Sequence, residues 1–441
     1  MGEIIINEPV LIDRKLIHKL SVSPNLNKFV KNLELFIEFD SDIYADESIL
    51  NIPLTAAVLP FAWLTGTDVQ VGKLDSRFHK SMGLLQQEFA KRYPHAPFKT
   101  EIHAEKLVEN KINITDQNRT GLLFSGGVDS TYSLINNIEH NPRLLMIWGV
   151  DNFAFPEHSD HWLKMIKVYK EFSNKQNLSF HIVKTNISQL LNDRKIEHSF
   201  HRELYDGSFR FALQYSLVLL PTLAPLSINR FDKLLISSGT THELVVQAIN
   251  KPRAARPWAD EKIVWANLEV DHHGLIGRHE KVLGIKDYVE NNELTLRVCL
   301  KSKLIDGNLN DSTCEKCLRT IASLVLAGVD PNECGFKVDK STFPNMKSFW
   351  EKRKTFGVDH TWREISTLIP DQYDFDYYGS KEFFEWFKDF DFKIIEKNWF
   401  YTDLYMRLPY RLARLLDTIY KKLDINVHES PTLREKQSVQ E

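Results

Sequence analysis

Cysteine is absent from the first 298 residues, and all four cysteines of the chain lie between Cys299 and Cys334. A framework of disulfides spread along the chain is therefore excluded, and the local cluster indicates a metal or thiol site. Long apolar runs are also lacking. The run from Leu54 to Pro60 falls well short of the roughly 20 apolar residues of a membrane span, and the N-terminus lacks the basic-then-apolar order of a signal peptide. We expect a cytoplasmic protein with no membrane partner.

An excess of charge of either sign is missing as well. The chain has 56 Lys and Arg against 59 Asp and Glu, which gives a formal net charge of −3 over 441 residues. Proteins that bind nucleic acid usually carry a strongly basic surface. Because the net charge of this chain is close to zero, nucleic acid is not expected as a partner. A hydrophobic share of 43% and a charged share of 26% are typical of a folded globular chain. These values exclude whole-chain disorder, collagen and coiled coil.

Strand and helix patterns divide the chain into four parts. Residues 1–118 combine an alternating strand at 33–39 with a helical stretch at 81–91, which predicts an α+β accessory domain. Residues 119–338 alternate short apolar runs with segments long enough for crossover helices. The remaining parts are an aromatic, helical region at 339–427, whose best helix is 411–423, and a flexible tail at 428–441.

The central part predicts an α/β fold. Its expected strands are 121–124, 144–150, 178–183 and 233–237. Their alternation with helices indicates βαβ units and a mainly parallel, Rossmann-like sheet. Ligands are expected at the carboxyl ends of such strands.

The most informative segment follows the first of these strands and reads SGGVDS at residues 125–130. Gly126 and Gly127 let the backbone approach a ligand closely. The N–H groups at the start of the following helix, together with the helix dipole, favour an anion. The segment is neither a Walker A loop, because no GxxxxG is followed by Lys and Ser or Thr, nor a GxGxxG turn. It predicts a phosphate-binding loop of another kind.

Hydroxyl groups and one carboxylate complete this loop. Ser125, Ser130 and Thr131 add hydroxyl donors. Asp129 is out of place in a loop that attracts anions, unless it organises Mg²⁺ or the loop itself.

The hexapeptide resembles the PP-loop of the N-type ATP pyrophosphatases, which include GMP synthetase, NAD synthetase, asparagine synthetase and 7-cyano-7-deazaguanine synthase. The resemblance covers about residues 119–335 and implies the HUP/PP-loop type of Rossmann-like fold, with ATP and Mg²⁺ as cofactors. It implies that ATP is cleaved between its α- and β-phosphates, that a substrate oxygen is adenylylated, and that a nucleophile then displaces AMP. The residues implied in ATP binding are Ser125, Gly126, Gly127, Val128, Asp129, Ser130, Thr131 and, at the end of the second strand, Asp151. Of these, Asp129 and Ser130 are expected to be catalytic.

The absence of early cysteines bears on the nitrogen source. Family members that draw ammonia from glutamine usually use a cysteine nucleophile, often at the mature N-terminus. Here position 2 is Gly2, and no cysteine precedes Cys299. We therefore expect free ammonia, or an amine carried by a substrate or partner, as the nitrogen donor.

The cysteines resemble the zinc knuckle of 7-cyano-7-deazaguanine synthase and of larger, related proteins from bacterial gene clusters. That knuckle has one cysteine, a gap and then CxxCxxC, whereas this chain has Asp311 where the first cysteine of the triplet is usual. The resemblance implies Zn²⁺ bound by Cys299, Cys314 and Cys317, with Asp311 or Cys334 as the fourth ligand. A redox pair, inert packing or an empty site remain alternatives.

Further polar residues follow the later strands or open helix-like runs. Thr240 and His242 come directly after the strand at 233–237, and Arg210 opens a helix-like run in which an arginine could neutralise phosphate or carboxylate. We expect Arg210 and His242 to serve catalysis and Thr240 to contact the acceptor substrate.

The Asp-His-His-Gly segment at 271–274 and the following Arg278 resemble a stretch common in the larger synthase-like proteins. On that resemblance His273 and Arg278 are expected at the substrate. A structural role for the paired histidines is favoured over a metal site, because adjacent residues rarely bind one ion. The same holds for the pairs His158/His161 and His198/His201.

Together these features predict a carbon–nitrogen ligase of the 7-cyano-7-deazaguanine synthase type. It would adenylylate a carboxylate or amide of a purine-like (deazapurine-like) substrate for attack by ammonia or an amine. Synthase-like proteins with extra terminal regions occur in bacterial anti-phage operons, which implies a protein partner from the same operon. Two alternatives stay open: an RNA sulfurtransferase that uses Cys314 or Cys317, and a nucleotide-binding module that has lost turnover.

Overall fold

The computed structural model describes residues 2–150, 159–204, 209–248, 257–292, 294–299, 307–352 and 360–392, together with Leu412 and Leu415. Asp151, His158, most of the predicted helix at 411–423 and the predicted tail lie outside the described residues.

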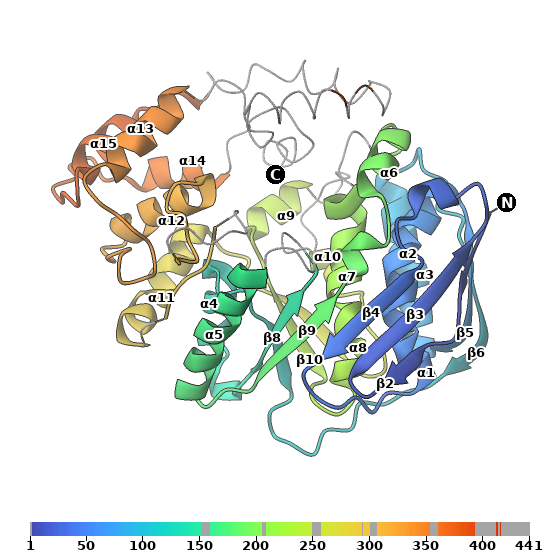
Figure 1. The fold of residues 1–441 in the computed structure, drawn as a ribbon. Helices are drawn as coiled ribbons and strands as arrows, with labels where there is room; N and C mark the ends of the chain where they lie inside the picture. The colour runs from blue at the N-terminus through green and yellow to red at the C-terminus, as the bar shows by residue number, and fades with distance from the viewer. Residues whose placement is uncertain are drawn as a thin grey trace.

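One sheet of eleven strands runs through the molecule (Figure 1). Its strands lie in the order β11-β10-β7-β8-β9-β4-β3-β1-β5-β6, with β2 paired to β3. The five strands at one end are all parallel: β7 (Thr120–Leu123), β8 (Arg143–Trp148), β9 (Phe180–Thr185), β10 (Lys233–Ser237) and β11 (Glu269–His273). This confirms the α/β class and a mainly parallel sheet, and places the predicted strands to within two residues.

The N-terminal strands extend the same sheet. They are β1 (Glu3–Ile6), β2 (Val10–Ile12), β3 (Lys15–Val22), β4 (Glu34–Phe39), β5 (Asp68–Asp75) and β6 (Ile102–Val108). β4 pairs antiparallel with β9, from Ile37 opposite Thr185 to Phe39 opposite Val183. Residues before 118 are therefore joined to the parallel strands by backbone hydrogen bonds, in addition to side-chain packing.

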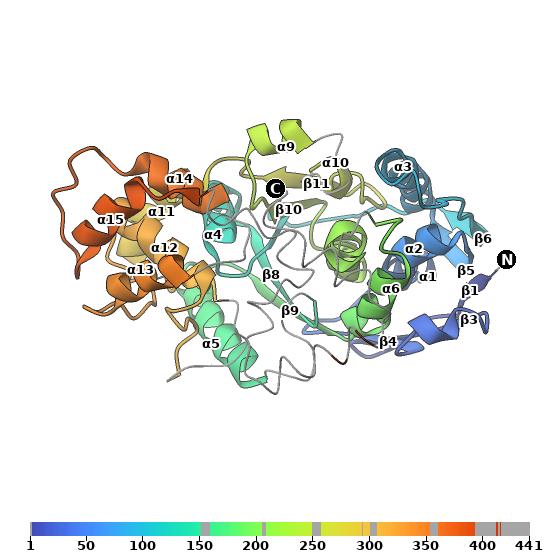
Figure 2. The same ribbon diagram turned by 90° about the horizontal axis from the view of Figure 1, so that it is seen from above.

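Helices cover both faces of the parallel strands (Figures 1 and 2). On one side lie α4 (Val128–Ile135) and α5 (Ser159–Lys175). The other helices of the first 292 residues are α1 (Glu47–Leu50), α2 (Ile52–Thr65), α3 (Ser76–Arg92), α6 (Asp193–Ser199), α7 (Tyr215–Leu219), α8 (Ala224–Ser227), α9 (His242–Ala248), α10 (Pro257–Asp260) and α11 (Arg278–Asn292). A π-helical turn, Arg210–Gln214, leads into α7. Short 3₁₀ turns occupy Asn27–Phe29, Ile138–His140, Ile187–Gln189 and Pro221–Leu223.

Alternation along the strands divides the apolar interior between the two faces. On β8, Leu144 and Met146 pack in a core with Trp162 of α5, while Leu145 belongs to the core on the opposite face with Phe231. Successive side chains of a strand point to opposite faces, so a run of apolar residues such as this one serves both cores.

The apolar helical stretch Glu47–Thr65 corrects one expectation from the sequence. Its 19 residues have a mean hydropathy of 1.5 and are long and apolar enough to cross a membrane, contrary to the expectation that the chain lacks a long apolar run. However, 94% of its apolar window is buried inside the protein. α2 packs against both β5 and α7, which explains an apolar surface all around the helix. It is a core helix of this fold.

The C-terminal described residues form a helical layer beside α11 (Figure 1). It contains α12 (Glu315–Leu326), α13 (Thr342–Lys352), α14 (His360–Leu368) and α15 (Ser380–Lys388). Its core is aromatic: the Trp350 ring lies 5.1 Å from that of Trp362 and 5.5 Å from that of Phe387, measured between centroids. Large buried rings at helical spacing therefore hold this layer together.

Trp350→Ala should destabilise the helical layer. Trp350 is 1% exposed, and truncation of a buried tryptophan to alanine costs about 3–5 kcal/mol. Urea unfolding followed by circular dichroism should show a clearly lower midpoint than for Phe375→Ala, whose side chain is 53% exposed. Equal midpoints for the two variants would contradict this packing.

Candidate functional site

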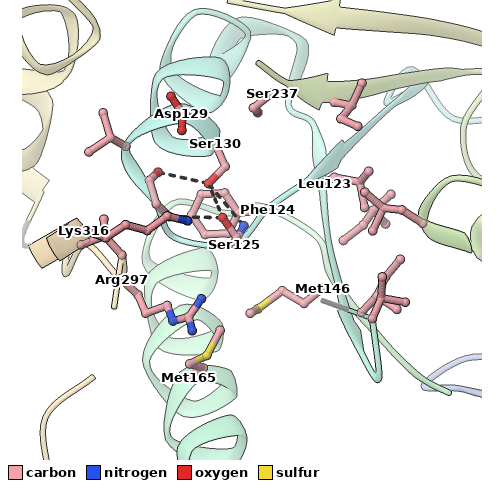
Figure 3. Close-up of a pocket in the computed structure, with 18 of the residues that line it drawn as sticks. Leu123, Phe124, Ser125, Asp129, Ser130, Met146, Met165, Ser237, Arg297 and Lys316 are labelled. Carbon is pink, nitrogen blue, oxygen red and sulfur yellow. Dashed lines mark hydrogen bonds between the residues drawn. The ribbon is translucent and has the colours of Figure 1, made fainter. Parts of the chain in front are cut away.

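A cavity of about 310 Å³ opens at the carboxyl ends of β7, β8 and β10. The chain order of the strands reverses here, because β8 lies on one side of β7 and β10 on the other. Open α/β sheets bind ligands at such a reversal. The SGGVDS loop at 125–130 forms one wall of this cavity (Figure 3).

The two glycines have distinct roles in the loop. Gly126 has a φ of +73°, and a Cβ there would lie 1.8 Å from the hydroxyl oxygen of Tyr169. Its carbonyl oxygen accepts a hydrogen bond from the backbone N–H of Arg297 at 2.7 Å. Gly127 is the N-cap of α4 and brings no side chain to cap the helix. The N–H groups of the first turn of α4 therefore have no side-chain cap, as an anion site requires.

Ser130 holds the loop closed. Its Oγ lies 3.3 Å from both the backbone nitrogen and the Oγ of Ser125, and it donates to the carbonyl oxygen of Gly127 at 3.1 Å. Thr131, in contrast, is fully buried in the interior. Of the predicted loop residues, the cavity lining contains Ser125, Gly127, Val128, Asp129 and Ser130.

Asp129 is held between two cations. Its Oδ2 accepts from Nη2 of Arg278 at 2.8 Å, and its Oδ1 accepts from Nζ of Lys281 at 2.9 Å. The side chain of Lys281 is only 2% exposed and also donates to the carbonyl oxygen of Ser238. Burial alone would raise the pKa of Asp129, but the charges of Arg278 and Lys281 outweigh it and hold that pKa below its ordinary value. The carboxylate therefore organises two cations beside the loop, so its presence is compatible with anion binding there.

Two more cations line the cavity. Arg297 comes from the segment 294–299, and Lys316 comes from the first turn of α12. Figure 3 shows both on one side of the cavity, with Leu123 and Met146 on the opposite side. The cavity thus has a cationic wall next to the loop and an apolar wall, which suits a ligand with an anionic group and a flat apolar body.

The structure brings one of the predicted substrate residues to the loop. Arg278 lines the cavity. The described lining includes neither Thr240 and His273 nor the predicted catalytic residues Arg210 and His242. Arg210 lies in the π-helical turn, the backbone carbonyl of Thr240 accepts a hydrogen bond from Ser238, and His242 begins α9 with an exposed side chain.

His273 lies at the end of β11 and faces α4. Its Nδ1 is 3.0 Å from Oγ of Ser133, and its Nε2 is 3.4 Å from Nδ2 of Asn137. Burial lowers the pKa of this imidazole. His273 thus occupies a position between the sheet and α4.

Three cations of the site were not predicted as site residues from the sequence: Lys281, Arg297 and Lys316. A signal for two of them was present. Arg297 precedes Cys299 by two residues, and Lys316 stands between Cys314 and Cys317, so a predicted metal cluster also fixes their backbones.

The predicted metal ligands come together. The donor atoms of Cys299, Asp311, Cys314 and Cys317 all lie within 4.8 Å of one another, and the Sγ atoms of Cys299 and Cys314 are 3.8 Å apart. Cys334 is buried but is not a member of this group. Three sulfurs and one carboxylate are suitable donors for tetrahedral zinc, so the residues fit this ion, with Asp311 as the fourth ligand.

The thiols interact strongly. Hydrogen bonds from Cys314 and Cys317 lower the pKa of Cys299, and the hydrogen bond to Cys299 raises the pKa of Cys314. The same contacts raise the pKa of Cys317. A divalent cation that binds three neighbouring cysteines displaces their thiol protons, so zinc binding here should release protons.

Comparison with known proteins finds no family model that matches this chain, no matching curated protein and no matching solved structure. The function of the chain is therefore inferred from its fold and from the geometry of the loop, the cations and the cysteine cluster.

The cysteine cluster makes a prediction about metal content. Purified protein should contain one zinc per chain by plasma mass spectrometry, and Cys317→Ser should lose it. Asp311→Ala should weaken zinc affinity by at least about tenfold, because even outer-shell changes cost that much. Cys334→Ser is the matched control and should keep its zinc. Full zinc retention in Cys317→Ser would contradict this ligand set.

The ion pairs of Asp129 predict a pH dependence of stability. A carboxyl group whose pKa is lower in the folded than in the unfolded state stabilises the fold above its ordinary pKa, and this contribution disappears as the pH falls. Asp129→Asn also leaves Lys281 buried without its carboxylate, which is destabilising. Its melting temperature should therefore be lower than that of the wild type by about 3 °C or more at pH 7.

Melting temperatures measured from pH 7 to about pH 3 test this prediction. The difference in melting temperature between the wild type and Asp129→Asn should become smaller toward low pH. Asp42→Asn is the control, because Asp42 pairs with Arg14 at the surface, where ion pairs contribute little. A difference that grows as the pH falls would contradict the lowered pKa of Asp129.

Proposed function

We propose that this chain is an ATP pyrophosphatase of the carbon–nitrogen ligase type, related to 7-cyano-7-deazaguanine synthase. The observation that carries the proposal is the loop at 125–130. It lies at the reversal of strand order, its following helix has no side-chain N-cap, and cations line one side of the cavity beneath it. This combination suits the phosphates of a nucleotide better than a neutral ligand.

The two walls of the cavity suit the two ends of ATP. The triphosphate would lie along the loop, within reach of Arg278, Arg297 and Lys316. The adenine would pack against the apolar wall, where Met146 of β8 and Trp162 of α5 contribute side chains. ATP is expected to arrive as its Mg²⁺ complex, so the metal is part of the substrate. Asp129 is assigned no metal, because both its oxygens already accept from cations.

The proposed reaction has two steps. An oxygen of the acceptor carboxylate or amide attacks the α-phosphorus of ATP, the bond to the bridging oxygen breaks, and pyrophosphate leaves. An amine nitrogen then attacks the activated carbon, a carbon–nitrogen bond forms, the amine loses a proton, and AMP departs. Negative charge develops on the leaving pyrophosphate in the first step, where fixed N–H groups and cations stabilise it most.

Each residue of the site has a task in this scheme. Arg297 and Lys316 neutralise the leaving pyrophosphate, and Arg278 does so from its position on Asp129. Ser130 keeps the loop closed around the phosphates. Asp129 is a poor general base at neutral pH, because its lowered pKa keeps it ionised but weakly basic, so its task is to orient two cations.

Zinc at Cys299, Asp311, Cys314 and Cys317 would be structural, since four protein ligands leave no open position for chemistry.

The acceptor in this proposal is a deazapurine-like acid or amide, and the nitrogen comes from ammonia or from an amine on a cytoplasmic partner protein. A role in anti-phage defence is part of the same proposal. It depends only on the resemblance of the chain to synthase-like proteins with extra terminal regions.

Product analysis tests the proposal. With ATP labelled at the α-phosphate, Mg²⁺, ammonia and 7-carboxy-7-deazaguanine, the protein should form AMP and pyrophosphate only when the acceptor is present. Formation of ADP and phosphate would contradict the proposal.

Lys316→Ala tests the cationic wall in the same assay. Removal of one group that stabilises transition-state charge costs about 10²–10³ in rate, so a loss of this order is expected. Lys340→Ala, at an exposed lysine outside the cavity, is the matched control. Equal rates for the two variants would remove Lys316 from the reaction.

A further inference from the structure

Helix α14, in the C-terminal helical layer, contacts the start of α11. Oε2 of Glu364 accepts from the backbone N–H of Arg278 at 3.2 Å, and Oε1 accepts from that of His279 at 3.2 Å. These are the first two N–H groups of α11, which have no partner within their own helix. A Cβ at Gly277 would lie 2.3 Å from Oε1 of Glu364, so a glycine leaves room for this carboxylate. A carboxylate here also complements the helix dipole.

The same helix contacts the start of α12. Nε1 of Trp362 donates to Oε1 of Glu315 at 2.7 Å, and Trp362 is fully buried. Glu315 is the first residue of α12, and Lys316 is the next. Both views of the ribbon place α14 beside these two helices (Figures 1 and 2).

The two helix starts that α14 contacts are those that carry cations of the cavity. Arg278 is the first residue of α11 and Lys281 is in its first turn, and both bind Asp129. Lys316 lines the cavity directly. Apolar packing continues this connection, since Val128 of the phosphate loop shares one core with Trp362.

The N-termini of α11 and α4 differ in charge. Glu364 occupies the N-terminus of α11 with a carboxylate, whereas the N-terminus of α4 has no side-chain cap. An anion in the cavity is therefore directed to α4 and away from α11.

We propose that Glu364 and Trp362 are positioning residues of the anion site: α14 fixes the first turns of α11 and α12, so that Arg278, Lys281 and Lys316 keep their places around the phosphate loop. Neither residue lines the cavity, so both act through the helices they hold. The inference rests on the proposed function in one respect, namely that the anion is the phosphate chain of a nucleotide. It makes the C-terminal helical layer part of that site.

Calorimetric binding of three probes to the full chain tests this inference: ATP with Mg²⁺, pyrophosphate with Mg²⁺, and adenosine. Glu364→Ala should weaken binding of ATP and pyrophosphate by about tenfold, because the cations lose their fixed positions. Adenosine binding should stay within about twofold of the wild type, because the apolar wall is untouched. The affinity of Glu364→Gln for ATP and pyrophosphate should lie between that of Glu364→Ala and that of the wild type. Its amide oxygen still accepts a hydrogen bond but carries no charge.

Further variants separate positioning from general damage. Trp362→Phe keeps one aromatic ring but removes the N–H donor together with the five-membered ring that carries it, and it should also weaken the phosphate probes selectively. Glu385→Gln, at an exposed glutamate of α15, is the matched control and should bind all three probes like the wild type.

Three results would overturn the inference. Unchanged phosphate binding in both Glu364→Ala and Trp362→Phe would show that α14 does not position the cations. Equal loss of adenosine and ATP binding in Glu364→Gln and Trp362→Phe would show general damage instead. If the wild-type chain binds neither ATP nor pyrophosphate, the proposed function fails and the inference fails with it.

Discussion

The carboxylate of Asp129, held between Arg278 and Lys281, is the interaction on which the rest of the site depends. The side chain of Lys281 is only 2% exposed, and a buried ammonium group requires a carboxylate beside it. These two ion pairs connect the SGGVDS loop to α11, and Glu364 connects α11 to α14 through hydrogen bonds from two backbone N–H groups. The ion pairs and the hydrogen bonds together link the loop to the C-terminal helical layer.

The remaining contacts of the loop follow from this arrangement. Gly126 can approach Tyr169 and accept from the backbone of Arg297 only because it has no side chain. The segment that carries Arg297 leads directly to Cys299, and α12 begins beside Cys314. The cysteine cluster is therefore placed where it can fix the backbones of two cations. A metal bound there would affect anion binding only through these backbones.

Local patterns could be predicted from the sequence, and long-range placements could not. The loop at 125–130 was predictable because strand, two glycines and helix are consecutive, and the cluster around Cys314 because its spacing is local. Pairing of β4 with β9 joins residues about 146 positions apart, such as Glu38 and Lys184, and no periodicity reveals it. Lys281 follows Arg278 in the same sequence stretch, but no local pattern shows that it pairs with Asp129. The stretch 47–65 shows a further limit, since composition cannot tell a core helix from a membrane helix.

A crystal structure with α,β-methylene ATP and Mg²⁺ would test the central claim most directly, because the methylene group prevents cleavage at the bond in question. The account predicts the triphosphate on the backbone N–H groups of residues 125–130, with the adenine against Met146 and Trp162. A nucleotide bound elsewhere, or a base placed on the loop with its phosphates in solvent, would contradict it.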